Sequence, residues 1–146
     1  MTTTIRKING LFDKGKALSP LFIRLIAGFH LIYVTKGAAF SSGKMQSVVH
    51  FFASQEIPAS HFLAPIVVYA EFICGILFIC GLFTRAAAIV MTVVFICAIS
   101  IVDIDNSYTS AFPALVMLAG SVSLLLSGSG NLSFDSFFRK KNQAGI

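Results

Sequence analysis

The chain has 146 residues, of which 56% are hydrophobic and only 12% are charged. A soluble domain of this size carries about a quarter charged residues, so the composition excludes an ordinary soluble domain and predicts a membrane protein. The net charge of +5 would suit a nucleic-acid binder in a soluble protein, but here the basic residues gather in the two tails, where they orient the chain and contact anionic headgroups. We therefore expect no nucleic-acid partner and a single transmembrane domain over residues 1–146.

The first expected elements are a basic tail over residues 1–19 and a membrane span over residues 20–40. Apolar residues recur at helical spacing in the tail, which favours a short amphipathic helix on the membrane surface. Ser19 followed by Pro20 is typical of a helix start, because proline at the first helical position loses no hydrogen bond. The sequence therefore predicts that the first span begins at this step.

The first span is the most polar one, because it carries Arg24, His30 and Lys36. Arg24 and Lys36 lie close enough to its two ends to extend their charged groups to the headgroups. His30 lies near the middle and reaches neither boundary. A polar residue at that depth predicts a helix that faces other helices or a cavity, not lipid on all sides.

The remaining elements follow from the alternation of polar connections and apolar runs. Residues 41–63 are too polar to cross a membrane, but their apolar residues keep helical spacing, which predicts a short interfacial helix stopped by Pro58. Three further spans and a second basic tail are expected over residues 64–83, 86–102, 108–126 and 127–146.

The distribution of basic residues predicts the topology. Eight of the eleven lysine and arginine residues lie in the two tails and in the turn at Arg85. Cytoplasmic segments are enriched in these residues, so we expect both termini in the cytoplasm. An even number of helices with short turns then gives an all-α, integral-membrane four-helix up-down bundle, with the interfacial helix outside between the first two spans.

Glu71 is the strongest candidate for a functional residue, because it is a carboxylate inside an apolar run of membrane-spanning length. A carboxylate at such depth costs a few kcal/mol unless it is protonated, paired or wetted. Counting residues from the ends of their spans places Glu71 and His30 both about 15 Å from the inner side. Such a pair could relay a proton or hydrogen-bond a quinone carbonyl. The alternative is a buried hydrogen bond that only fixes helix packing.

Other charged residues suggest weaker sites. Arg24 and Arg85 both lie near the inner boundary, where they could bind a lipid phosphate or an anionic substrate. Alternatively they set the topology and contact headgroups, which is the preferred interpretation for Arg85. His50 and His61 fall on the outer side near carboxylates, but their spacings match no known ligand pattern, so no metal site is predicted.

Several segments, taken in chain order at the ends of the four spans, carry a family resemblance. They are Arg24-Leu25 with Gly28, the connection from Met45 through Phe52 to Ile57-Pro58, the run from Glu71 to Gly75 and on through Gly81 to Ala87, and the exit segment from Ser127 to Asp135. In order and spacing these segments resemble the DoxX family of small four-helix bacterial membrane proteins, and the likeness covers nearly the whole chain.

The resemblance implies a multi-pass protein of the bacterial cytoplasmic (inner) membrane, and in some members an association with quinone-linked oxidoreductases. Our first functional expectation is therefore a redox-linked protein that contacts quinone, or serves an oxidoreductase as a subunit or accessory, with Glu71, His30 and Arg24 lining the pocket. The alternatives are a non-catalytic scaffold or stress-related accessory protein, and a small-solute or proton carrier in which Glu71 titrates. The sequence is compatible with a homo-oligomer, but neither oligomerisation nor catalysis follows from it.

Overall fold

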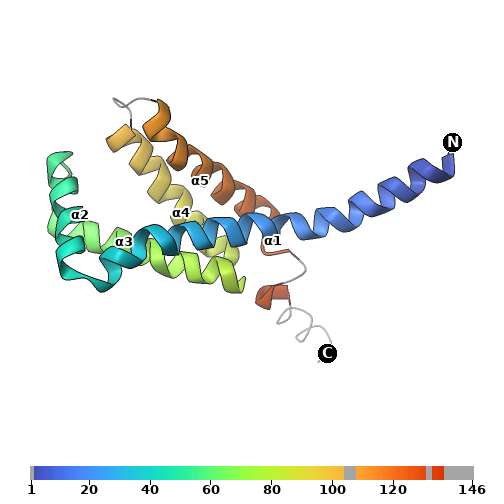
Figure 1. The fold of residues 1–146 in the computed structure, drawn as a ribbon, viewed down its shortest axis with the longest axis horizontal. Helices are drawn as coiled ribbons and strands as arrows, with labels where there is room; N and C mark the ends of the chain where they lie inside the picture. The colour runs from blue at the N-terminus through green and yellow to red at the C-terminus, as the bar shows by residue number, and fades with distance from the viewer. Residues whose placement is uncertain (1, 104–107, 131–132, 137–146) are drawn as a thin grey trace.

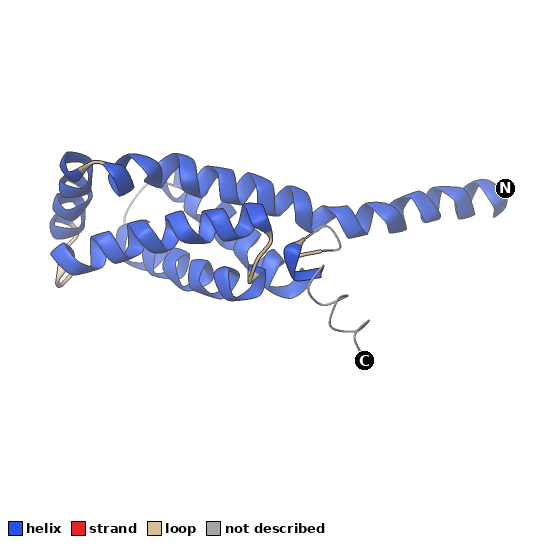
Figure 2. Ribbon diagram, turned by 90° about the horizontal axis from the view of Figure 1, so that it is seen from below, coloured by secondary structure: helices blue, strands red, loops and turns tan. Residues whose placement is uncertain are grey.

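The computed structural model describes residues 2–103, 108–130 and 133–136, and its regular structure in these ranges is helical. Figures 1 and 2 show an elongated bundle with one helix laid across one end. The elements are α1 (Thr2–Phe40), α2 (Ser42–Ser54), α3 (Ser60–Cys80), α4 (Thr84–Ala98), its π-helical continuation η1 (Ile99–Asp103), and α5 (Tyr108–Ser127). The all-α fold class is therefore confirmed.

The long helices form two closely packed pairs, α1 with α3 and α4 with α5. The pairs meet at the end of the bundle that holds the α3–α4 turn at residues 81–83, called here the turn end. Figure 1 shows that they diverge toward the opposite end, which carries α2 and is called here the α2 end. The apolar core joins both pairs and includes Leu31, Cys74, Phe78, Ala88, Met91, Phe95, Met117 and Leu124.

Two glycines allow α1 and α3 to cross closely. A Cβ added to Gly28 would lie 2.7 Å from the carbonyl oxygen of Gly75, and one added to Gly75 would lie 3.0 Å from the carbonyl oxygen of Gly28. Small residues at such a crossing bring two helix backbones into direct van der Waals contact, which drives helix association where lipid replaces water. Gly28 and Gly75 are therefore packing residues of the α1–α3 crossing.

Within the part of the chain that the structure describes, three helical segments are long and apolar enough to cross a membrane, namely Leu18–Phe40, Ser60–Cys80 and Thr84–Ile101. They correspond to the first three expected spans. The fourth expected span corresponds to α5, whose apolar part Ala111–Ser127 is shorter. Many large apolar side chains on these helices are exposed, among them Phe22, Ile66 and Val93, as expected for surfaces that face lipid.

The predicted helix start at Ser19 and Pro20 is wrong. α1 begins at Thr2 and runs without a break through Pro20, and its N-terminal part projects beyond the other helices (Figures 1 and 2). Proline removes only one backbone donor, and a helix that is favourable on both sides of it can continue through the missing bond. The tail is helical as expected, but it is continuous with the first span.

The helix expected between the first two spans is confirmed as α2. It ends at Ser54, ahead of the Ile57-Pro58 step, and lies across the α2 end with Val49 buried (Figure 1). Other expectations lie outside the described residues. These concern the polar connection at residues 104–107 and most of the second basic tail, at residues 131–132 and 137–146.

Candidate functional site

Glu71 occupies a position on the buried stripe of α3. The neighbouring positions of this stripe, at spacings of three and four residues, are Ala64, Val68, Gly75 and Phe78, all of which are buried. Glu71 itself is half-buried. Because residues at this spacing share one helix face, the carboxylate points inward between helices rather than into lipid.

No hydrogen bond or ion pair joins the Glu71 side chain to any other residue that the structure describes. Two threonine hydroxyls on α1 and α4, the helices that pack against α3, donate to carbonyl groups of their own helices. Thr35 Oγ1 donates to the Leu31 carbonyl at 2.6 Å, and Thr92 Oγ1 donates to the Ala88 carbonyl at 2.7 Å. An acid in such surroundings is stable when it is neutral or when a polar partner reaches it.

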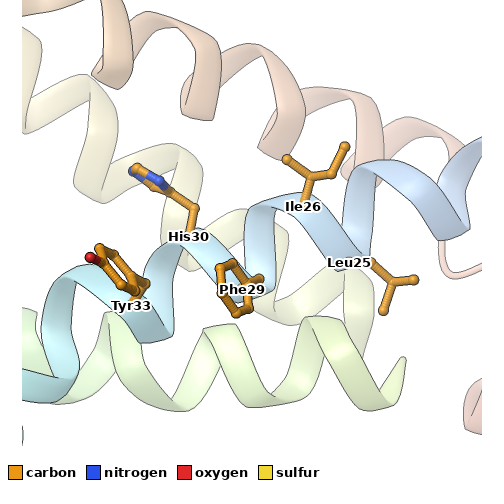
Figure 3. A pocket seen from close by; sticks show the side chains of 5 residues that line it. All are labelled: Leu25, Ile26, Phe29, His30 and Tyr33. Atoms are coloured by element: carbon orange, nitrogen blue, oxygen red, sulfur yellow. The ribbon is translucent and has the colours of Figure 1, made fainter.

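His30 lies on the outward face of α1. At 3.6 residues per turn it is about 200° around the helix from Gly28, which faces α3. Its side chain is exposed and, with Leu25, Ile26, Phe29 and Tyr33, lines an almost wholly apolar surface groove of about 380 Å³. Figure 3 shows these five side chains projecting from the one helix.

The expected pairing of Glu71 with His30 does not form in the structure. The residue count placed both side chains at one depth, but depth says nothing about the direction in which each points. His30 is exposed on the outer face of α1, whereas Glu71 belongs to the inner stripe of α3. The two residues therefore remain separate candidates.

Arg24 lies at the turn end with only 2% of its surface exposed. Its guanidinium donates to the carbonyl of Ser129 at 2.7 Å and interacts electrostatically with the Asp135 carboxylate. The expectation that Arg24 extends to the headgroups is wrong, because the chain that follows α5 covers it. Arg24 is not among the residues that line the groove at His30, so it is a third, separate candidate.

Arg85 is exposed in the first turn of α4. Its side chain runs beside Gly128, so that a Cβ at Gly128 would lie 3.3 Å from Arg85 Nε. The position leaves the guanidinium accessible to solvent or headgroups. An anion-binding or topology-setting role for Arg85 stays a prediction.

His50 and His61 are both exposed, on α2 and in the first turn of α3. Among the described residues, no three histidine, cysteine, aspartate or glutamate side chains lie close enough together to hold a metal ion.

Asp135 is an important residue that the sequence patterns do not single out. Its carboxylate accepts hydrogen bonds from the backbone N–H groups of Phe83, at 2.8 Å, and Thr84, at 3.1 Å, at the start of α4. These partners are 52 and 51 residues away in the chain. The available signal was the lack of any acidic residue in the first turn of α4, a position that favours negative charge.

Comparison with known proteins identifies relatives of this chain. The family model described as DoxX matches residues 19–104, a range that holds Arg24, His30, Glu71 and Arg85. A protein of Bacillus subtilis (strain 168) described as "Putative oxidoreductase CatD" is 30% identical over 135 residues, which cover 91% of this chain and 96% of that protein. No solved structure matches the chain.

Proposed function

We propose, from the premise that this chain belongs to the DoxX family, that it is a redox-linked membrane protein in which Glu71 hydrogen-bonds the head group of a lipid-soluble quinone. The observation that carries the proposal is the position of Glu71. It is a carboxylic acid on the inner stripe of a membrane-length helix, with no hydrogen-bond or ion-pair partner among the described residues.

The chemistry of Glu71 and its neighbours supports a quinone head group as the proposed ligand. A quinone carbonyl is an acceptor without a donor of its own, and a neutral carboxylic acid supplies the O–H that it needs. The remaining surface of the ligand is apolar, as are the neighbouring buried positions Val68 and Cys74. A bound quinone would supply reversible uptake of two electrons and two protons, and Glu71 would hold or deliver a proton at one carbonyl oxygen.

The B. subtilis relative adds support, because its name describes an oxidoreductase. This chain would then act as the quinone-contacting subunit or accessory of a membrane oxidoreductase system, with the electrons supplied by a partner. We propose His30 as a separate contact for quinone. The apolar groove beside His30 opens on the outward face of α1, which a molecule dissolved in the lipid can reach. We assign Arg24 no role in this site.

The proposal includes a topology of four spans. α5 packs along α4 and returns the chain to the turn end, where Ser129 meets Arg24 of α1. If α5 is a fourth span, the start of the first span and the end of the fourth span lie on the same side of the membrane. The basic tails favour the cytoplasmic side of the bacterial inner membrane for both.

Purification in mild detergent, followed by lipid extraction and mass spectrometry, tests the proposal. We expect quinone to co-purify with the wild-type protein, and its amount to fall about tenfold in Glu71→Leu, because a hydrogen bond to a polar head group is lost. Glu56→Gln, which changes the other glutamate on an exposed turn, should keep the wild-type content.

Two results would contradict the proposal. A stoichiometric protein partner without quinone would favour the non-catalytic scaffold. A protein without quinone or partner that carries protons across sealed vesicles, and loses this flux in Glu71→Leu, would favour the carrier.

A further inference from the structure

The α3–α4 turn depends on residues from the far end of the chain. Gly81 ends α3 with a φ of 69°, and Phe83 precedes α4 with a φ of 47°, a left-handed conformation that is uncommon for a residue with a side chain. Phe83 makes no side-chain cap for α4, and the first turn of α4 holds no acidic residue. The turn therefore lacks a local group that would satisfy the first N–H groups of the helix.

Asp135 supplies the missing cap. Its Oδ1 accepts from the Phe83 N–H at 2.8 Å, and its Oδ2 accepts from the Thr84 N–H at 3.1 Å. Its own N–H donates to the Gly81 carbonyl at 3.1 Å. Three hydrogen bonds thus join one residue of the C-terminal segment to both sides of the turn, and a negative charge lies at the positive end of the α4 dipole.

Arg24 anchors the same segment to α1. The Arg24 side chain is buried, donates to the Ser129 carbonyl and interacts electrostatically with Asp135 and with the Cys80 thiol. Gly81 lies so close that a Cβ there would collide with the guanidinium. A buried cation is stable only with compensating partners, so the contacts of Arg24 depend on the segment staying in place.

The segment is also folded on itself. Ser133 Oγ lies 2.9 Å from Ser129 Oγ and 3.0 Å from the Gly130 carbonyl oxygen, so its one proton is shared between these two acceptors, and it accepts from the Ser136 N–H at 3.1 Å. These bonds hold Asp135 at the position from which it reaches the turn. The segment as a whole is attached to the helices by polar contacts, which lie at the turn end of the bundle.

We propose that the described residues 128–130 and 133–136 form a releasable strap. With Asp135 on the turn and Arg24 under Ser129, the strap joins α1, the end of α3, the start of α4 and the end of α5. It thereby pins the two helix pairs together at the turn end, while they diverge at the α2 end. Release of Asp135 uncaps α4 and opens the region around Arg24 and Cys80 to water.

Cys80 provides the test, because it is half-buried beside Arg24. The full-length protein in lipid nanodiscs is treated with a water-soluble maleimide, and labelling at each cysteine is followed by peptide mass spectrometry. We expect Asp135→Ala to raise the labelling rate at Cys80 about tenfold or more. The substitution removes hydrogen bonds to a charged group, so the strap leaves its closed position more often. Phe134→Ala, which removes an exposed neighbouring ring, should leave the rate unchanged.

Cys74 distinguishes local release from unfolding, because it is buried in the core away from the strap. Faster labelling at Cys80 with Cys74 still protected supports the strap. If Asp135→Ala exposes both cysteines, Asp135→Asn, which keeps the size of the side chain, is measured instead. An unchanged Cys80 rate in Asp135→Ala, or Cys80 and Cys74 rates that rise together in Asp135→Asn, would overturn the proposal.

Discussion

Replacing Gly28 with alanine is expected to lower the free energy of unfolding of the protein in detergent by about 2 kcal/mol. The new methyl group would lie 2.7 Å from the Gly75 carbonyl oxygen and 2.9 Å from Ile79 Cγ1. The isoleucine side chain can rotate, but the carbonyl belongs to the backbone of α3, so the two helices must separate. Chemical denaturation of the purified protein, followed by circular dichroism, measures the change.

Gly120→Ala is the matched control, since Gly120 also lies inside a long apolar helix, α5. Among the described residues, a Cβ there would meet only Ile23 Cγ2, at an ordinary contact distance of 3.8 Å. Alanine is favoured over glycine in a helix interior by up to about 1 kcal/mol. We therefore expect unchanged or slightly increased stability at Gly120. Equal losses at Gly28 and Gly120 would contradict the close crossing of α1 and α3.

Replacing Glu71 with leucine is expected to abolish quinone-dependent function while the bundle stays folded. The Glu71 carboxyl has no hydrogen-bond partner among the described residues, so its loss leaves no other group there unsatisfied. Leucine is similar in size and apolar, so the melting temperature in detergent should be unchanged or higher, corresponding to up to about 1 kcal/mol. Thermal unfolding and quinone reduction in membranes from an expressing strain measure the two effects.

Glu71→Gln separates shape from acidity. Glutamine keeps the side-chain length and can donate a hydrogen bond, but it cannot exchange a proton. We expect this variant to retain part of the quinone and to lose turnover. If Glu71→Leu fails to accumulate while Glu71→Gln folds normally, Glu71 holds the helices together through a structural hydrogen bond.

Much of the fold could be predicted because local patterns determine it. The length of the apolar runs identified three membrane-length helices, and the spacing of apolar residues identified α2. The start of α1 was missed at Pro20, because a sequence signal that commonly begins a helix can also be accommodated inside one. The π-helical turn η1 was not foreseen either, since nothing in the sequence 99–103 marks it.

The candidate site was harder to predict, because it depends on directions and on distant contacts. Residue counts placed Glu71 and His30 at the same depth. The direction of the His30 side chain, however, depends on which face of α1 packs against α3. That face is known only from the structure, in which Gly28 contacts α3. Arg24 was expected at the headgroups because the segment that covers it comes more than a hundred residues later. Contacts between residues so far apart in the chain leave no periodic pattern in a single sequence.

The most direct test of the central proposal is the chemical reactivity of Glu71 itself. Dicyclohexylcarbodiimide dissolves in membranes and reacts with protonated carboxyl groups, whereas a water-soluble carbodiimide reaches carboxyl groups exposed to water. If Glu71 binds quinone, the lipid-soluble reagent should modify Glu71 selectively, and ubiquinone-1 at about ten times its dissociation constant should slow this labelling about tenfold. Labelling of Glu71 that is unaffected by the quinone, or preferential labelling by the water-soluble reagent, would contradict the account.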